Sequence, residues 1–413
     1  MRLLVVSQYF WPEDFRVNNL VAELVERGHE VTVLTGLPNY PGGTIFAQYK
    51  AQPGQFGVYA GAAIVRVPLL PRGRGRVSLI LNYLSFAVSA SLVGSWRLRG
   101  LKFDAIFVYE PSPATVGIPA VLLRAIKKAP LAFWVLDLWP ETLQAIGVVR
   151  SSVLLRAIGS LVSYIYNRCD LILAQSKSFI PQIAKHCSSP GHIRYFPSWA
   201  ESVFDLAGQM PAPEVPAQDA GFSVMFAGNI GEAQDFPAVL AAAELLKGHS
   251  RIRWLVVGDG RMAQWVSEEI RRRSLQDCVL MLGRHPVERM PAFYRHADAL
   301  LVCLKDEPIF SMTIPGKLQS YLAAGIPVVA MLNGEGAEVV ERSGSGLTCR
   351  AGDARGLAAA VLELASLSAE RRAEMGKNAL AVSASEFNRS RLISQLECWL
   401  VELSACGVAT VDS

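Results

Sequence analysis

Short apolar runs alternate with amphipathic, helix-spaced segments from one end of the chain to the other. At the beginning, Leu3–Val6 reads as a buried strand, Val17–Arg27 has the spacing of an amphipathic helix, and Val31–Leu34 reads as a second strand. Strand, helix and strand within about 35 residues form a βαβ unit, whose two strands pair in parallel. The pattern therefore predicts a parallel sheet with its ligands at the carboxyl ends of the strands.

The same alternation continues in two series that are separated by a turn-rich segment. Residues 206–221 are rich in Pro, Ala and Gly, which is typical of a linker. We predict an α/β protein with two Rossmann-like, doubly wound domains over residues 1–205 and 222–385, and a C-terminal helix over 386–413 that packs back toward the N-terminal domain. Further strands are expected at Ile64–Val67, Ala105–Val108, Leu131–Leu136, Leu171–Ala174, Ile193–Phe196, Phe222–Phe226, Arg253–Val257, Val279–Leu282 and Ala299–Val302.

The segment FSMTIPGKLQSYLAAGIPVVA, residues 310–330, combines a predicted helix with an unusual charge. Thr313 and Pro315 are residues that start helices, and Gly325 is a natural residue to end one. Lys317 then falls in the first helical turn, where the helix dipole disfavours a cation. A lysine beside free first-turn N–H groups is typical of a site for an anion such as a phosphate, and the alternative is a lysine that points into solvent.

Several strands of the second series end in a glycine-bearing loop. AGNIGEAQD at 227–235, GDG at 258–260 and GRHP at 283–286 each follow a predicted strand. Loops of this kind in register suit a nucleotide that is bound by backbone N–H groups and helix N-termini.

Composition and charge narrow the classes of function. The 413 residues are 51% hydrophobic and 18% charged and include 33 Gly, which is typical of buried parallel strands in two domains. The net charge of +4 is too small to indicate nucleic-acid binding. The seven Cys are scattered, which suits free thiols in a reducing cytosol, and the N-terminus lacks a signal-peptide pattern. With no D-x-D motif and no clustered His and Cys, we expect no metal and no other cofactor.

An apolar run, Val77–Trp96, has basic residues on both sides. Arg72, Arg74 and Arg76 precede it, and three more basic residues follow within positions 97–102. The run is about long enough to span a bilayer, but its Ser, Asn and Gly content favours one or two largely buried helices whose basic ends rest on anionic lipid. A membrane span and ordinary solvated helix ends are the alternatives.

Polar residues gather just past the predicted strand ends of the N-terminal domain. Glu13 follows the first strand, the loop PNYPGG follows the second, and Glu110 and the motif DLWPE follow later strands. Chemistry in a doubly wound sheet is concentrated at these strand ends, so Asp137 and Glu141 of DLWPE are candidate catalytic residues. The alternative is that Asp137 caps the next helix while Trp139 packs.

Six motifs that together span nearly the whole chain are GHEVTVLTGLPNYPGG, DLWPE, PSWAE, AGNIGEAQDF, GDGR and PGKLQSYLAAGIPVV. They resemble the GT-B glycosyltransferases of family 4, and most of all the bacterial WbuB-like subgroup, which transfers N-acetyl-L-fucosamine. The resemblance implies two Rossmann-like domains that face each other across a cleft, and a retaining transfer from a UDP-sugar. The acceptor that it implies is a polyprenyl-diphosphate-linked saccharide in O-antigen, capsule or exopolysaccharide synthesis.

The resemblance also implies roles for residues of both domains, with Asp137 and Glu141 as the catalytic pair. Two departures from the family pattern stand out. Met312 and Ser320 replace the usual pair of Glu, and Asn229 and Gln234 replace the phosphate-binding Arg and Lys. On the acceptor side, the expected residues are Glu13, Asn39, Tyr40 and Glu110. On the donor side, they are Asn229, Gly231, Gln234, Gly258, Gly260, Arg261, Arg284, Pro315, Lys317, Leu318 and Ser320.

The expected partners are a UDP-sugar, a lipid-linked saccharide and a membrane surface, with no nucleic acid. The expected place is the cytoplasm, peripherally on the inner face of the bacterial plasma membrane. Two other functions stay open. A non-hydrolysing UDP-sugar 2-epimerase has the same two-domain fold but needs several carboxylates and His around the sugar, and the six His here are dispersed. The second open function is a noncatalytic subunit that binds nucleotide sugar. It stays open because the Glu pair that is usual in the family is missing.

Overall fold

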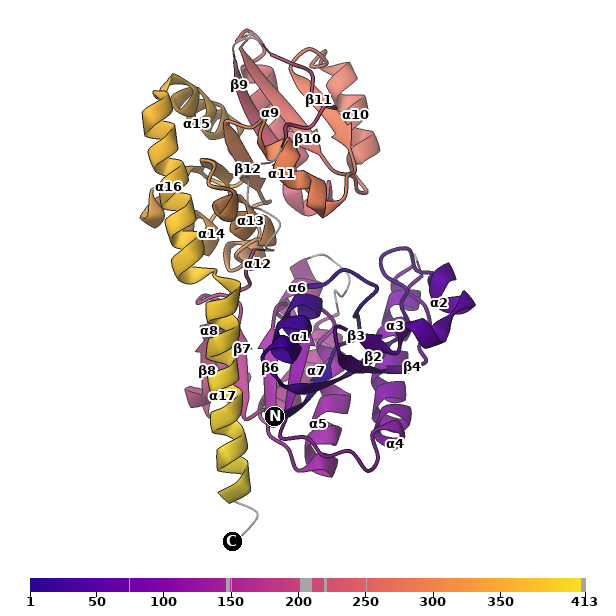
Figure 1. Cartoon of the computed structure of the whole chain (residues 1–413). Coiled ribbons are helices and arrows are strands. Elements are labelled where there is room, and N and C mark those ends of the chain that lie inside the picture. Colours follow the sequence, from indigo (N-terminus) through magenta and orange to yellow (C-terminus); the bar gives the residue numbers. More distant parts are fainter. Residues whose placement is uncertain are drawn as a thin grey trace. The chain divides into compact units, whose positions relative to one another are not determined.

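The computed structural model describes residues 1–73, 75–145, 149, 151–200, 210–218, 221–249 and 251–409. The chain divides into two units, Met1–Phe196 with Ser390–Ser413 (unit 1) and Pro197–Arg389 (unit 2). Each unit is built around its own sheet (Figure 1). The chain thus enters unit 2 once and returns to unit 1 with its last helix.

The described residues of unit 1 form an eight-stranded sheet in the order β3-β4-β2-β1-β5-β6-β7-β8, parallel except for the β3–β4 pair. The strand order reverses between β1 and β5, so the loops after these two strands flank the point where ligands bind in such sheets. The strands are β1 (Arg2–Val6), β2 (Glu30–Gly36), β3 (Val58–Tyr59), β4 (Ala62–Val67), β5 (Ala105–Glu110), β6 (Leu131–Val135), β7 (Leu171–Ala174) and β8 (Ile193–Tyr195). The helices are α1 (Arg16–Glu26), α2 (Ala47–Ala51), α3 (Arg76–Ser89), α4 (Ser95–Arg97), α5 (Gly117–Lys127), α6 (Glu141–Ala145), α7 (Ser152–Tyr166), α8 (Phe179–Ala184) and, after unit 2, α17 (Arg389–Ala409).

The described residues of unit 2 form a six-stranded, fully parallel sheet in the order β11-β10-β9-β12-β13-β14. This is the doubly wound order of a nucleotide-binding sheet, and its strand order reverses between β9 and β12. The strands are β9 (Phe222–Ala227), β10 (Ile252–Val257), β11 (Val279–Gly283), β12 (Ala299–Cys303), β13 (Val328–Met331) and β14 (Gly346–Cys349). The helices are α9 (Phe236–Leu245), α10 (Ala263–Arg272), α11 (Met290–Tyr294), α12 (Pro308–Ser311), α13 (Gly316–Ala324), α14 (Glu335–Ser343), α15 (Ala354–Ser366) and α16 (Ala369–Glu386).

The predicted α/β class with two Rossmann-like domains is confirmed. Every residue of the central strand β9 is buried, as expected for a parallel strand covered by helices on both faces. Helix α1 ends one residue before the predicted boundary, and Gly28 follows it with a φ of +87°, which glycine adopts without strain. Strand β5 is longer than predicted and includes Glu110 as its last residue.

The apolar run at 77–96 does form a helical segment, through α3, one π-helical turn and α4, but the prediction that it is largely buried is wrong. Only 33% of its apolar 18-residue window is buried. Tyr83 and Phe86 face the unit 1 core, whereas Val77 and Val88 are 71% and 58% exposed. The polar residues Ser78, Asn82, Ser85 and Ser89 share one stripe that faces unit 1, whereas the outer face is apolar, so the usual rule that the apolar side packs inward does not apply to this run. By length and composition alone, this helix, among those described, is apolar enough to cross a membrane.

Helix α17 packs on unit 1 although it follows unit 2 in the sequence. The Glu397 carboxylate accepts a hydrogen bond from Arg27 at 3.0 Å, and its other oxygen lies 2.9 Å from His29 Nε2. Leu396 and Leu400 on the same helix are fully buried. The contacts join residues that are about 370 positions apart, so the last helix completes the core of the first unit.

The described part of the predicted linker, residues 210–218 and 221, packs on unit 2. The Ala212 N–H donates to the Ala292 carbonyl at 3.0 Å, and Glu214 forms an ion pair with Arg289 at 2.8 Å. The other linker positions lie outside the described residues, as does the glutamate of the PSWAE motif, Glu201.

Candidate functional site

Three loops at the carboxyl edge of the unit 2 sheet are bonded to one another through their backbones. The loop after β9 donates from Ile230 N–H to the Asp259 carbonyl at 2.9 Å, and Gly258 N–H donates to Gly283 at 2.7 Å. The packing leaves no room for side chains at the crossing, because a Cβ on Gly258 would lie 1.9 Å from the Gly228 carbonyl oxygen. The glycines that the sequence indicated therefore let the backbones approach closely, as a phosphate-binding edge requires.

Lys317 lies in the first turn of α13, directly beside this edge, as the sequence predicted. Its ammonium is 3.6 Å from the centre of the Phe226 ring and 3.5 Å from the Asn229 carbonyl oxygen. Burial lowers the pKa of Lys317 to about 8. In the described part of the chain no carboxylate forms an ion pair with it. A partly buried cation with no ion-pair partner at a helix N-terminus is arranged for an anion.

Tyr321 explains why α13 begins where it does. Its hydroxyl accepts from the Ala227 N–H at 2.9 Å and donates to the Ala227 carbonyl at 3.1 Å, which joins the helix to the end of β9. Helix α13 ends at Gly325 in the left-handed conformation, as predicted, and Pro315 lies at its N-terminal boundary. Thr313 does not cap the helix, because its hydroxyl donates to the Ile309 carbonyl at 2.9 Å.

Two other predicted donor residues, Asn229 and Gln234, differ in whether their side chains are free to contact a ligand. Asn229 is exposed at the crossing of the loops, beside Gly260, where a Cβ would lie 2.7 Å from Asn229 Oδ1. Gln234 is used within its own loop, because its Oε1 accepts from the Gly231 N–H at 3.0 Å. Gln234 therefore supports the loop that carries the predicted phosphate contacts.

Four of the predicted donor residues lie outside the crossing of the loops. Arg261 and Arg284 are exposed, each just past the glycine of its loop. The side chain of Leu318 is fully buried in the core, where it can contribute packing but no ligand contact. The Ser320 hydroxyl donates back to the Gly316 carbonyl of its own helix at 3.4 Å.

In unit 1, the Glu13 carboxylate organises the loop that follows β2. Its Oε1 accepts from the backbone N–H groups of Asn39 and Tyr40, both at 2.7 Å, and Oε2 accepts from Phe10 at 3.2 Å. Burial raises the pKa of Glu13 to about 7, although these three hydrogen bonds act in the opposite direction. Glu13 is thus inside the loop structure, and its effect on a ligand is indirect.

Asn39 in turn positions Arg72. The Arg72 N–H donates to Asn39 Oδ1 at 2.9 Å, and the guanidinium lies 5.3 Å from the centre of the Tyr40 ring. Among the described residues, no carboxylate forms an ion pair with Arg72. Of the other two predicted membrane residues, Arg74 lies outside the described residues, and only the backbone of Arg76 is described.

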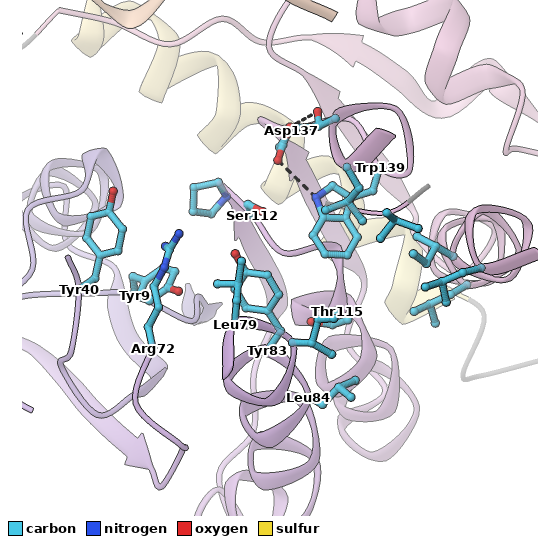
Figure 2. Close-up of a pocket in the computed structure, with 18 of the residues that line it drawn as sticks. Tyr9, Tyr40, Arg72, Leu79, Tyr83, Leu84, Ser112, Thr115, Asp137 and Trp139 are labelled. Atoms are coloured by element: carbon cyan, nitrogen blue, oxygen red, sulfur yellow. Dashed lines mark hydrogen bonds between the residues drawn. The ribbon is translucent and has the colours of Figure 1, made fainter. Parts of the chain in front are cut away.

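Asp137 is held by the residues that follow it in the loop after β6. Its two oxygens accept from the Thr142 hydroxyl at 2.5 Å and from the Trp139 indole N–H at 3.3 Å (Figure 2). Burial raises the pKa of Asp137 to about 6, while hydrogen bonds from Thr142, Trp139 and Ser112 lower it. Asp137 therefore holds side chains of its own loop and of α6, and it also lines a cavity.

The two other carboxylates of this edge lie differently. Glu110 is fully buried, with one oxygen 3.4 Å from the Asp137 N–H and the other without a partner among the described residues. Burial and the nearby Asp137 raise the pKa of Glu110 well above its usual range. Glu141 begins α6, partly exposed, and does not line the cavity that Asp137 lines.

The cavity lies in unit 1 and has a volume of about 450 Å³. Figure 2 shows Tyr40 and Arg72 at the left of the lining, Asp137 at the top and Leu84 at the bottom. Helices α3, α6 and α7 and the loops after β1, β2, β4, β5 and β6 supply the walls. Of the predicted residues, the fold thus brings Asp137, Tyr40 and Arg72 together at one cavity.

Sequence reasoning missed the residues that complete this cavity. Tyr9, Tyr83 and Ser112 line it, and each lies close to other polar residues within or just after an apolar segment. Ser112 has a φ of +128°, a costly conformation for a residue with a Cβ, of the kind that often marks a functional loop. A polar residue in an apolar run was the available signal, but it does not say which polar residues meet.

No group of three or more His, Cys, Asp and Glu that could hold a metal ion occurs among the described residues. In unit 2, Lys317 and the first-turn N–H groups of α13, together with the exposed Arg261 and Arg284, could face an anion.

Comparison with protein families finds a match in each unit. Residues 15–199 match the model of a glycosyl transferase 4-like domain, and residues 221–366 match the model of glycosyl transferases group 1. Among named proteins, the chain is 26% identical over 341 residues to WcaI of Escherichia coli (strain K12), which is named for colanic acid biosynthesis, with 79% of this chain and 82% of WcaI covered. It is 27% identical over 143 residues to the amylovoran biosynthesis glycosyltransferase AmsK of Erwinia amylovora, with 34% and 35% covered.

Among solved structures, the chain is similar to HepE of Anabaena in complex with UDP and glucose. The TM-score is 0.68 at 15% sequence identity, with 97% of this chain and 99% of HepE covered. At this identity the likeness shows the fold, and the fold is GT-B, with a parallel Rossmann-like sheet in each unit.

Proposed function

We propose that this chain, which belongs to the GT-B glycosyltransferases of family 4, moves a sugar from a UDP-sugar to a lipid-linked saccharide. Unit 2 would bind the UDP-sugar and unit 1 the acceptor. The observation that carries the proposal is Lys317, a cation without an ion-pair partner in the described chain, in the first turn of α13 beside three glycine loops. That HepE was solved with UDP and glucose supports the same class of donor.

The diphosphate is the group that unit 2 is suited to hold. The usual Glu pair is absent at Met312 and Ser320, so no carboxylate at those positions opposes the negative charge of the diphosphate. Lys317 and the first-turn N–H groups of α13 would stabilise that charge, and it increases as the bond to the sugar breaks. Arg261 and Arg284 are exposed on the neighbouring loops and are free to approach a bound phosphate.

The transfer needs no covalent intermediate with the protein. The bond between the anomeric carbon and the diphosphate breaks, and a bond forms from the same face of the sugar to an acceptor oxygen, which gives retention. The acceptor proton passes to the departing phosphate, so the products are UDP and a lengthened saccharide. Asp137, ionised above about pH 6, would orient the acceptor hydroxyl or assist its deprotonation.

The pathway that we propose is the synthesis of a bacterial surface polysaccharide. WcaI and AmsK are named for two exopolysaccharides, which supports this choice over other glycosyl transfers. For the sugar that is transferred in this pathway, we propose an N-acetylated deoxyamino sugar such as N-acetyl-L-fucosamine. The support for this choice is the resemblance of the motifs DLWPE and GNIGEAQ to the subgroup that transfers it.

We also propose peripheral binding to the inner face of the plasma membrane, through α3 and the arginines before it. Its outer side chains Val77, Leu81 and Val88 are 71%, 47% and 58% exposed, and such apolar faces mark surfaces that bind lipid or protein. Each basic residue near an anionic bilayer adds on the order of 1 kcal/mol. Replacing Arg72, Arg74 and Arg76 by Gln should therefore abolish flotation with anionic liposomes.

The test of the proposed function is a screen of UDP-sugars against undecaprenyl-diphosphate-linked GlcNAc, read by mass spectrometry. One UDP-sugar should give a product heavier by one sugar, with release of UDP. No transfer from any donor, with UDP binding intact, would favour a noncatalytic subunit. Proton NMR of the donor without acceptor separates the epimerase, because only an epimerase interconverts free UDP-sugars.

A further inference from the structure

The cavity of unit 1 has a polar side and an apolar end. Arg72, Tyr9, Tyr83 and Asp137 lie on the polar side. The volume of about 450 Å³ falls within the range of small-molecule sites, about 300–1,000 Å³. Beyond the polar side, the lining is aliphatic and comes from two helices, through Leu79, Ile80 and Leu84 of α3 and Leu154, Ile158 and Leu161 of α7.

The apolar end is open toward the surface of the protein. Ile80, Leu84 and Leu154 line the cavity and yet are 42%, 47% and 46% exposed. On α3 they adjoin Val77 and Leu81, which face outward. A ligand in this cavity could therefore have an apolar chain that continues out of the protein without meeting polar groups.

The polar side presents a cation followed by a carboxylate. Arg72 has no ion-pair partner within the described ranges, and its backbone is held by Asn39. Each Asp137 oxygen accepts one hydrogen bond, from the Thr142 hydroxyl or the Trp139 indole N–H. A carboxylate oxygen can accept a second hydrogen bond, so Asp137 can also accept one from a sugar hydroxyl. A ligand that satisfies the whole cavity has an apolar part for the two helices, an anionic group for Arg72 and a hydroxyl group for Asp137.

We propose that this cavity holds the first isoprene units of a polyprenyl diphosphate sugar, with Arg72 on its diphosphate. The proposal rests on the proposed function, because a sugar transfer supplies the reason for an acceptor at Asp137. The exposed apolar face of α3 then lies where the rest of the chain leaves the cavity for a bilayer. Tyr40 and Arg72, which Glu13 and Asn39 position, form the diphosphate end.

The test is direct binding of farnesyl diphosphate to the full chain, by calorimetry without any UDP-sugar. Ile158→Trp fills the apolar end and should weaken binding at least about tenfold, because the chain has no other place to be buried. Val153→Trp, on the same helix but 66% exposed and outside the cavity, should leave binding unchanged. Equal affinities of the two variants would overturn the apolar subsite.

The charge is tested separately with farnesol and a matched arginine. Arg72→Gln should weaken farnesyl diphosphate about tenfold to a hundredfold, the effect of one charged hydrogen bond, and leave farnesol unchanged. Arg168→Gln is the control, because Arg168 also lies over a tyrosine, 3.7 Å from the ring of Tyr164. A diphosphate affinity that is unchanged in Arg72→Gln would overturn the role of Arg72.

Two further measurements separate this proposal from the proposed function. UDP affinity, a property of unit 2, should be the same in all four variants, and their unfolding temperatures in scanning calorimetry should equal that of the unaltered chain, which shows that unit 1 folds. If no donor is transferred but Ile158→Trp still abolishes farnesyl diphosphate binding, the function is wrong and the subsite stands. If transfer proceeds while farnesyl diphosphate does not bind the unaltered chain, the subsite is wrong and the function stands.

Discussion

Burial disfavours the charge of several ionisable side chains of the candidate sites, and it brings the pKa values of three of them close to neutral pH. Burial lowers the pKa of Lys317 to about 8 and raises the pKa of Glu13 to about 7 and that of Asp137 to about 6. Groups that titrate near neutral pH are concentrated at sites that bind charge or transfer protons. Glu13 is occupied by three backbone N–H groups, so Lys317 and Asp137 are the two that can act on a ligand.

Lys317→Met should weaken UDP binding and leave folding intact. One charged hydrogen bond is worth about 1.5–3 kcal/mol, which corresponds to a loss of about tenfold to a hundredfold in affinity. The affinity of the unaltered chain should also fall as the pH rises above about 8, because Lys317 then loses its proton. Calorimetry near pH 8 in two buffers of different ionisation enthalpy should detect proton uptake on binding.

Lys247→Met is the matched control, since Lys247 lies at the exposed end of α9. Its UDP affinity and pH dependence should equal those of the unaltered chain. An unchanged dissociation constant in Lys317→Met would mean that the diphosphate is held elsewhere.

Asp137→Asn should lower kcat and leave UDP affinity nearly unchanged, because the side chain lies in unit 1. The carboxyl of Asp137 is ionised above about pH 6 and protonated below it, so activity should fall as the pH drops through 6. That acidic limb should disappear in the Asn variant, whereas a merely structural role would lower activity without moving the limb. Full activity of Asp137→Asn combined with Glu141→Gln would return both residues to supporting the loop.

At the scale of elements, α3 and α13 show two ways in which an apolar sequence is used. Helix α13 has a polar first turn and a buried body, and Tyr321 joins it to β9. Helix α3 has its polar residues on the face that unit 1 covers and leaves an apolar face outward. An apolar face left in water costs about 25 cal/mol for each Å² that could be buried, so it is a surface for association.

The outer face of α3 should be required for binding to anionic liposomes. Leu81→Glu with Val88→Glu places two charges on this face without entering the cavity, and should strongly reduce flotation. Leu245→Glu, at a site that is 54% exposed in unit 2, is the control and should float as the unaltered chain does. Raised salt should largely release the protein, since it screens the attraction between the arginines and the anionic lipid. Equal flotation of both variants would place the membrane contact elsewhere.

At the scale of the whole molecule, each unit has a separate core, and α17 belongs to the core of unit 1. Arg27 donates to Glu23 and Glu397, and it also donates to Ser390 and Ser394 of α17. The hydrogen bonds from Arg27 and His29 lower the pKa of Glu397 despite its partial burial. The contact is therefore made of a polar cluster beside fully buried leucines.

Leu396→Ala should destabilise unit 1 by about 2–5 kcal/mol, the usual cost of emptying a buried leucine site. Val401→Ala on the same helix, at a site that is 47% exposed, should change stability by less than about 0.5 kcal/mol. Scanning calorimetry should show the loss in Leu396→Ala, while UDP affinity stays the same because unit 2 is untouched. Loss of UDP binding together with stability would show that the two units unfold as one.

The sequence by itself determined the order of strands and helices, the glycine loops and the place of Lys317. These follow from local rules of periodicity, helix ends and the dipole of the first turn, which need only a few neighbouring residues. The motifs also pointed to a glycosyltransferase, the class whose domain models match both units. Leu318 shows the limit of this reasoning, because a position inside a motif does not tell a core residue from a ligand contact.

Only the tertiary structure decided which of these residues meet. Arg72, Asp137 and Ile158 come from separate segments, and the cavity that joins them exists only where two helices and several strand ends converge. The exposed face of α3 and the return of α17 to His29 are likewise set by what packs against them. Contacts between distant segments depend on volumes and distances in space, and a pattern along the chain does not contain those quantities.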